Sequence, residues 1–570
     1  MYDVIIRDGL VVDGTGLPAR NADVGINEGR ITAVGRLRGE QAATVIDAAG
    51  AVVAPGIVDA HTHYDPQVTW DPMCDTSALH GVTTVVSGNC GFSLAPCRAE
   101  DRAYLAQVFA RVEGMDLSAL SHVDWRFESF PEFLGSLDGR LGLNMGAYVG
   151  HSAVRRYVMG EASHERAATD VERDRIVALV DEAMAAGAMG WSSSHAPVHL
   201  DLADRPVPSR LADLDELRAL ADVVGRAGRG SIAYAPQSSV EGIGPADRDL
   251  LIELAARGGV PVITQGLGGR NKVDAPDLAW ADAAKFLDRS TSNGTPVYCL
   301  LMTRGFNGPF TLAHGTTRYE GVSLWHELFS LPLDARRARI ADPDRRAAYR
   351  HAVDHYNTDP NAGSTLPPPV WDLMVIDEVR ADANRSYVGR TVGEIARDEG
   401  RHPTDVMFDI ALADDLLTVF HWNSESPQWR EIMRVAQRHP NMILGVSDGG
   451  AHLDRDDGAA WSTHFLERWW RAEGLWRLEE AIRLITAIPA RVCGIADRGV
   501  LAPGWHADVM VFDPDALRAE DSRLETDVAT GVPRFRNIPR GFAATVVNGV
   551  PVVLDGAVTG ALPGQVVRPA

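Results

Sequence analysis

Two histidines one residue apart, His61 and His63, follow an apolar run in the stretch PGIVDAHTH. Side chains alternate along an extended strand, so both imidazoles would point the same way. Two neutral ring nitrogens placed in this manner supply half of a tetrahedral metal site. Asp59, at the end of the apolar run, could support one of these rings from behind. A lone pair of this kind more often binds nothing, so partners are needed elsewhere in the chain.

Cys90 and Asp448 are the candidates for those partners, and each closely follows a strand-like apolar run. Cys90 lies in SGNCGFSLAP between glycines that allow close backbone approach, and a thiolate is a good metal ligand. Asp448, in GVSDGG, could bind a metal, take a proton from water and pass it to a leaving nitrogen. The alternatives are a small buried hydrophobe for the cysteine and a turn residue for the aspartate.

The candidates lie in a long segment, 55–499, that alternates strand-like and helix-like runs. Its strand-like runs are GIVDAHTH, TTVVSGNCG, NMGAYVGHS, GAMGWSSS, GSIAYAP, PVITQG, PVYCLLMT and NMILGVSDGG. Amphipathic stretches such as ERDRIVALVDEAMAAG separate several of them, which is typical of parallel strands. Eight runs predict an α/β fold of the (β/α)₈ TIM-like barrel type, whose catalytic groups gather at the C-terminal ends of the strands. His151 and His195 also follow strands in this pattern.

The two chain ends share a different texture of short alternating strands and Gly or Asp turns. Residues 1–54 and 500–570 therefore predict one small β-sandwich domain made by both ends. Within the barrel segment, the alternation of strand-like and helix-like runs is interrupted at about 304–414. This interruption predicts an insertion between strands seven and eight. Such an insertion is either a lid over the site or a solvated decoration.

Composition and charge limit the kinds of molecule that this protein can bind. The chain has 570 residues, a formal net charge of −22 and no basic patch, which argues against nucleic acid and anionic membranes. It shows no apolar run of about 18 residues and no leader-like start, so we expect neither a membrane span nor a signal peptide. Its five cysteines form no CxxC pair, which fits a reducing, cytoplasmic compartment. A small-molecule partner is expected, and a homo-oligomer is left open.

Several segments together resemble the amidohydrolase superfamily and, within it, the N-acyl-D-amino-acid deacylases, or D-aminoacylases. They are PGIVDAHTH, GVTTVVSGNCGFSLAP, VGHSAVR, GAMGWSSS, GVSDGG, RGVLAPGWHADVMVFDPDAL and VVNGVPVV. The likeness spans nearly the whole chain. It implies a zinc enzyme with His61, His63, Cys90 and Asp448 around the metal, the cysteine standing where relatives use a carboxylated lysine. Neither Lys272 nor Lys285 lies at the end of strand four, where such a lysine would be needed.

The sequence departs from this family at the ends of strands five and six, where the family has histidine ligands. Tyr234 and Gln265 are found in those regions, so we expect one zinc ion rather than two. The family's carboxylate-binding lysine is also missing from strand six. Arg270 or Arg304 could replace it, and the sequence does not choose between them.

Three further residues are candidates for contacts with substrate: His151, His195 and Gln265. His195 or the nearby His199 could instead supply a metal ligand, or be a surface histidine.

The function predicted from these residues is hydrolysis of the amide bond of an N-acylated amino acid or related small amide. Water activated by the metal attacks the carbonyl, and Asp448 transfers the proton. One alternative is a hydrolase of a cyclic amide, a carbamate or another amide that is not an amino acid. Another is a binding barrel that has lost its metal centre. The acyl group, the amine part and the D or L preference stay open.

Overall fold

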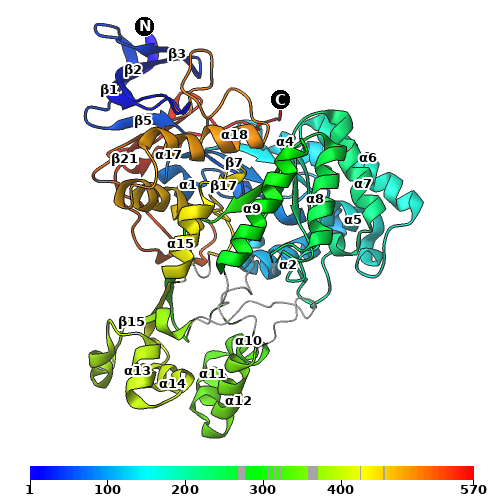
Figure 1. Cartoon of the computed structure of the whole chain (residues 1–570), viewed down its shortest axis with the longest axis vertical. Helices are drawn as coiled ribbons and strands as arrows, with labels where there is room; N and C mark the ends of the chain where they lie inside the picture. The colour runs from blue at the N-terminus through cyan, green and yellow to red at the C-terminus, as the bar shows by residue number, and fades with distance from the viewer. Residues whose placement is uncertain are drawn as a thin grey trace.

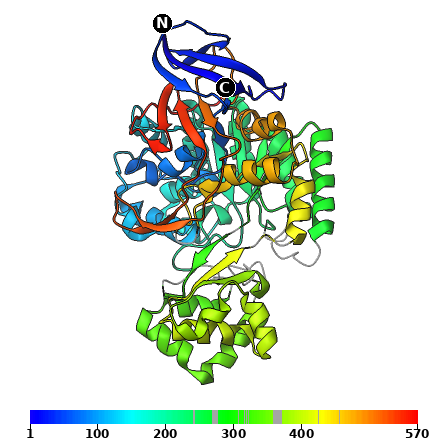
Figure 2. The same ribbon diagram turned by 90° about the vertical axis from the view of Figure 1, so that its left-hand side faces the viewer.

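The computed structural model describes residues 1–239, 242–267, 276–305, 307–313, 316, 319, 322–356, 370–423, 425, 427–453 and 456–570. It is a mixed α/β protein with three parts: a sheet shared by the chain ends, a set of parallel strands with helices, and a separate lobe. The sheet and the lobe lie at opposite ends of the molecule (Figures 1 and 2). In the described residues no helix is both long and apolar enough to cross a bilayer.

Strands from both chain ends form one nine-stranded sheet. β5 (Val52–Pro55) pairs antiparallel with β18 (Val509–Phe512), and this pairing joins the N-terminal strands to the C-terminal ones. The other members are β1 (Tyr2–Val11), β2 (Arg20–Asn27), β3 (Arg30–Gly35), β4 (Ala42–Asp47), β21 (Phe542–Val547), β22 (Val550–Leu554) and β23 (Ala557–Val558). These strands from both chain ends share one hydrogen-bonded network, and the β-sandwich predicted for this part stays a prediction. Alternation along a strand does not specify which strands pair, so the sequence pattern could not give this strand order.

The parallel strands form two further sheets. One holds β6 (Ile57–Asp59), β7 (Val82–Ser87) and β8 (Asn144–Ala147); the other holds β9 (Val149–Gly150), β10 (Gly190–Ser194), β11 (Ser231–Ala235), β12 (Val262–Thr264), β13 (Val297–Leu301) and β17 (Met442–Leu444). Only Tyr148 separates β8 from β9 in the chain. A parallel bridge between Thr62 and Gly449 links the segments that follow β6 and β17.

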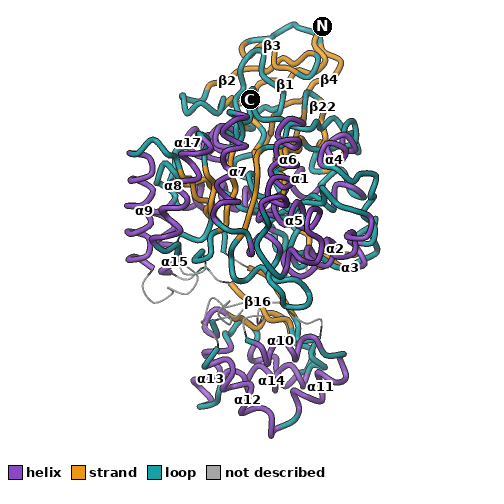
Figure 3. The backbone as a smooth tube through the Cα atoms, turned by 90° about the vertical axis from the view of Figure 1, so that its right-hand side faces the viewer, coloured by secondary structure: helices purple, strands orange, loops and turns teal. Residues whose placement is uncertain are grey.

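The helices of this part pack outside its strands and explain its buried strand pattern. All six residues of β7, VTTVVS, are buried, as expected of a strand covered on both faces. Helices flank the strands on both sides in Figure 3, among them α6 (Asp170–Ala186), α7 (Leu214–Ala227) and α8 (Pro245–Gly258). α6 begins with a capping box between Thr169 and Glu172 and ends at Gly187, whose φ of 107° suits glycine.

The lobe follows β13 and precedes β17 in the chain. Its sheet, in the order β14-β16-β15, consists of β14 (Asn307–Phe310), β16 (Val419–Asn423) and β15 (Met374–Glu378). Its helices are α10 (Ser323–Ser330), α11 (Leu333–Ala341), α12 (Pro343–Asp354), α13 (Val392–Glu399) and α14 (Pro403–Ala413). They enclose a hydrophobic core around Trp325. The central strand β16 lies beyond 414, the end predicted for the insertion.

Candidate metal centre

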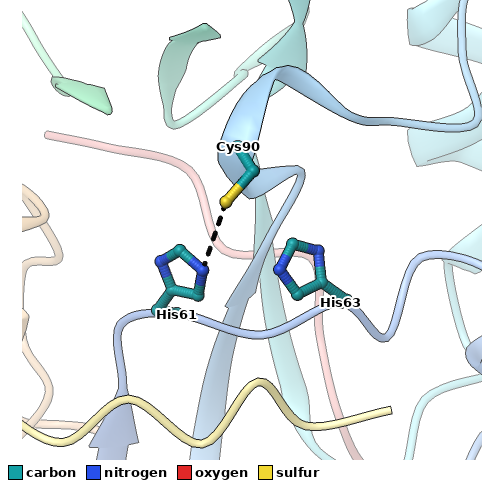
Figure 4. Close-up of side chains that lie close together, drawn as sticks. All are labelled: His61, His63 and Cys90. Atoms are coloured by element: carbon teal, nitrogen blue, oxygen red, sulfur yellow. Dashed lines mark hydrogen bonds between the residues drawn. The ribbon is translucent and has the colours of Figure 1, made fainter. Parts of the chain in front are cut away.

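His61 and His63 follow β6 and point into the same buried space (Figure 4). Their exposed fractions are 3% and 1%. The intervening Thr62 is anchored on the other side, because its backbone N–H and hydroxyl both donate to the carbonyl oxygen of Val86. The alternation of a strand is thus kept past the end of β6, and it places both imidazoles on the inner side.

Cys90 approaches the two rings from the turn after β7. Potential ligand atoms of His61, His63 and Cys90 all lie within 4.8 Å of one another, and Cys90 Sγ is 3.6 Å from His61 Nε2. Cys90 has a left-handed φ of 57°, which costs a residue with a side chain roughly 1–2 kcal/mol. Gly88 must be glycine here, since a Cβ on it would lie 2.2 Å from the Tyr148 carbonyl oxygen. Strain of this kind is often held at functional sites.

Asp448 comes from the loop after β17 and faces both histidines. Its Oδ1 atom is 3.3 Å from His61 Nε2 and 3.9 Å from His63 Nε2. The backbone is left-handed here as well, with φ 49°. The Asp448 side chain is 24% exposed, and it lines a cavity together with Arg304 and His452. The structure therefore brings together all four residues that the sequence proposed around a metal.

The spacing and chemistry of these donors fit a zinc-type ion. Nitrogen and oxygen donors at about 2.0–2.2 Å from a tetrahedral ion are roughly 3.4 Å apart, and nitrogen and sulfur donors are roughly 3.6 Å apart. The His61–Asp448 distance of 3.3 Å and the His61–Cys90 distance of 3.6 Å match these values. Burial lowers the pKa of His61 and, more strongly, of His63. Both rings are therefore neutral and can donate to a cation.

Asp59 supports the backbone of this site and not a histidine ring. Its carboxylate accepts hydrogen bonds from the His61 backbone N–H at 3.4 Å and from the Trp461 indole N–H at 3.1 Å. Burial raises the pKa of Asp59 to about 6. The sequence suggested a contact with a ring, but the described hydrogen bonds of this carboxylate go to the His61 backbone and to Trp461.

Glu113 and His452 also border the centre, and sequence reasoning missed both. Glu113, the last residue of α2 (Arg102–Glu113), is 3% exposed. Its Oε2 atom lies 3.4 Å from His63 Nε2 and 3.7 Å from His452 Nε2. A carboxylate is unfavourable at a helix C-terminus and in a buried place, so its position beside the two histidines indicates a role in the site. No motif marked Glu113, because it ends an ordinary amphipathic helix.

The other predicted histidines already have protein partners. His151 is buried, with Nδ1 2.8 Å from Ser193 Oγ and Nε2 2.7 Å from Glu216 Oε1. His195 has Nδ1 2.7 Å from the Tyr234 hydroxyl, and its Nε2 is 3.1 Å from the Ala212 carbonyl oxygen. No described contact supports a role for either in substrate binding, so that role stays a prediction.

His199, the other histidine of this segment, has Nδ1 2.7 Å from Ser194 Oγ, and its ring centroid is 5.3 Å from that of Phe92. It lies near enough to His63 to help lower that residue's pKa, after burial and His61. Its suggested role as a ligand also stays a prediction.

Gln265 is placed at the centre itself. Its Nε2 amide lies 3.6 Å from Cys90 Sγ, and it lines a narrow cavity together with His61, Cys90 and Tyr234. Arg304 lines the cavity beside Asp448, with its guanidinium 2.7 Å from an Asp456 carboxylate oxygen. Arg270 falls outside the described residues.

Comparison with known proteins identifies the family. The model of the amidohydrolase family matches residues 44–300 and 376–553, more than half of the chain. This chain belongs to the amidohydrolase family. The amidohydrolase is 30% identical to an uncharacterized protein of Mycobacterium tuberculosis over 96% of this chain and 91% of that one. It is 28% identical to the D-aminoacylase of Alcaligenes xylosoxydans xylosoxydans over 99% and 97% of the two chains. The resemblance predicted from the sequence is confirmed.

Solved structures give the same fold. The amidohydrolase matches a D-aminoacylase structure with a TM-score of 0.64, covering all of both chains at 24% identity. That protein is described as having a binuclear metal center with one-metal activation and second-metal attenuation. At this sequence identity the similarity supports the fold alone, and the chemistry has to be argued from the residues of this chain.

Proposed function

We propose that this amidohydrolase is a one-metal hydrolase of the amide bond in an N-acylated amino acid or a related small amide. The observation that carries the proposal is the convergence of His61, His63 and Cys90 in one buried cluster faced by Asp448. The D-aminoacylase relatives, which align with nearly the whole chain, support the substrate class.

The architecture that positions these residues is, in our proposal, a closed (β/α)₈ barrel. Counting β8 and β9 as one stave, the parallel strands supply eight staves, and the Thr62–Gly449 bridge would join the first to the last. The barrel would span 55–499 with the lobe inserted between staves seven and eight, and 1–54 and 500–570 would form the β-rich companion. Catalytic groups gather at the C-terminal ends of strands in such barrels, where the four site residues lie.

Each side chain has a definite task in this proposal. A bound zinc ion would supply a Lewis acid for the amide carbonyl and lower the pKa of water. His61, His63 and the Cys90 thiolate hold the ion. Asp448, partly exposed toward the cavity, accepts the proton of the attacking water and delivers it to the leaving nitrogen. Burial of the two histidines keeps them neutral, so they neither compete for that proton nor repel the cation.

A related substrate class is favoured by one specific observation. Arg304, the described arginine in the cavity beside Asp448, is already paired with Asp456 at 2.7 Å. A substrate carboxylate would have to compete with that aspartate. A cyclic amide, carbamate or other neutral amide needs no such exchange, and we retain it as the second candidate.

The test combines metal content with a substrate panel. Protein purified in metal-free buffer and reloaded with zinc should hold close to one ion per chain, and chelation should abolish turnover. Matched D and L N-acyl amino acids are then compared with neutral amides, hydantoins and carbamates. Preference for acylated amino acids supports the first substrate class, and preference for neutral amides supports the second. Protein that binds no zinc and cleaves nothing in the panel would overturn the proposal in favour of a binding barrel.

A further inference from the structure

Gln265 makes a contact that the proposed reaction leaves unexplained. It follows β12 directly, and its side-chain amide Nε2 reaches Cys90 Sγ at 3.6 Å, within the range of an N–H···S hydrogen bond. The next residue, Gly266, has φ 91°, and a Cβ there would lie 2.3 Å from the Ser239 carbonyl oxygen. The tight turn therefore fixes the direction in which Gln265 leaves the strand.

The sulfur of Cys90 contacts His61 and Gln265 at a small cavity that Tyr234 also lines. His61 Nε2 is 3.6 Å away, the Gln265 amide lies at the same distance, and Tyr234 lines the same cavity. A thiolate that bridges two cations gives a lone pair to each of them. The amide N–H of Gln265 donates to a lone pair of this sulfur, which then favours a second cation less.

Tyr234 adds little affinity for a second ion. Its hydroxyl is 2.7 Å from His195 Nδ1, so the phenol is already engaged. Burial raises the pKa of Tyr234 above its ordinary value, which keeps it a neutral phenol. Neutral phenol and amide oxygens are weak zinc ligands beside imidazole and thiolate.

We propose that Gln265 takes the place of a second cation by donating its amide N–H to the Cys90 thiolate, so that the sulfur remains a terminal ligand of one ion. The inference rests on the proposed one-metal function and assigns Gln265 as a positioning residue, which acts through Cys90. An N–H donor stabilises negative charge on the sulfur without adding a positive ion. Groups that support a ligand in this way set metal affinity.

The test uses the full-length protein and reads the metal directly. Gln265→Leu removes the donor, and Gln237→Leu, an exposed glutamine after the neighbouring strand β11, is the matched control. In the cobalt(II) form, loss of the hydrogen bond should move the sulfur-to-cobalt charge-transfer band of Gln265→Leu to longer wavelength. Zinc affinity should fall by roughly 10–100-fold. The control should leave both unchanged.

The reverse change should open the second position. The double variant Tyr234→His, Gln265→His supplies two imidazoles beside Cys90. With zinc in excess, the bound metal should rise from one ion per chain to about two, because each ion then has nitrogen and sulfur ligands. Wild-type protein that takes up two ions would overturn the inference, as would a Gln265→Leu band and affinity equal to wild type. If the double variant does not fold, those two measurements still decide. Wild-type protein that binds no ion would instead refute the proposed function.

Discussion

Asp448→Asn is the sharpest test of how the site works. Asp448 has a left-handed backbone with φ 49°, a conformation that asparagine adopts at least as readily as aspartate. Alanine would add roughly 1–2 kcal/mol of strain at this position and confuse the result. Asparagine keeps the shape and removes only the negative charge and the proton acceptor.

The expected effect follows from the contacts. The Asp448 carboxylate lies 3.3 Å from His61 Nε2, and its partial exposure lets it reach a water molecule and a leaving nitrogen. Loss of a general base lowers kcat roughly 10²–10⁴-fold, which corresponds to about 2.7–5.4 kcal/mol in the barrier. His61, His63 and Cys90 remain, so the variant should still hold one ion per chain.

The assay measures released amine from the best substrate of the panel, together with zinc per chain by elemental analysis. Asp415→Asn is a suitable control, because Asp415 has a similar φ of 58° but lies just after α14 in the lobe. It should retain full kcat. If Asp448→Asn keeps kcat within twofold of wild type, or loses its zinc altogether, the assignment of Asp448 as the proton acceptor is refuted.

Other substitutions probe the remaining parts. Cys90→Ser should preserve the fold but weaken zinc binding by more than the roughly 10–100-fold that loss of a supporting group costs; unchanged affinity in a chelator competition would exclude Cys90 as a ligand. Glu113→Gln should reduce zinc affinity within that roughly 10–100-fold range through its 3.4 Å contact with His63, and a variant with normal affinity would leave Glu113 a purely structural role. Burial lowers the pKa of His80 from 6.5 to about 3. On acidification His80 therefore becomes protonated in the unfolded chain at a higher pH than in the folded chain. The free energy of unfolding should fall as the pH drops from 6.5 toward 3, by up to about 1.4 kcal/mol per pH unit. His80→Gln should flatten the change in urea midpoint between neutral and mildly acidic pH; a slope equal to wild type would show that other groups dominate. Trp325→Ala, in the lobe core, should cost roughly 3–5 kcal/mol locally and make the lobe sensitive to protease while zinc content stays constant; loss of zinc would show that the two parts unfold together.

Local patterns in the sequence predicted much of the fold and of the site. Because side chains alternate along a strand, the common direction of His61 and His63 follows from the strand itself, and the glycines around Cys90 indicate a tight turn. Repeated apolar runs indicated parallel strands, and these are present, as is the pairing of the two chain ends through β5 and β18. Side-chain directions and turns depend on neighbours in the chain, so the sequence contains them directly, whereas the pairing of the two ends was inferred from their similar strand patterns.

Only the folded chain brings together groups whose proximity no local pattern encodes. Glu113 ends a helix and His452 follows a turn, yet Glu113 lies beside His63 and His452 lies beside Glu113. The same packing engages both nitrogens of His151 with Ser193 and Glu216, and it turns the amide of Gln265 toward Cys90. The sequence by itself determined which residues could bind a metal and the strands that carry them. The tertiary structure decided which side chains surround those residues, because contacts between distant segments depend on how strands and helices pack.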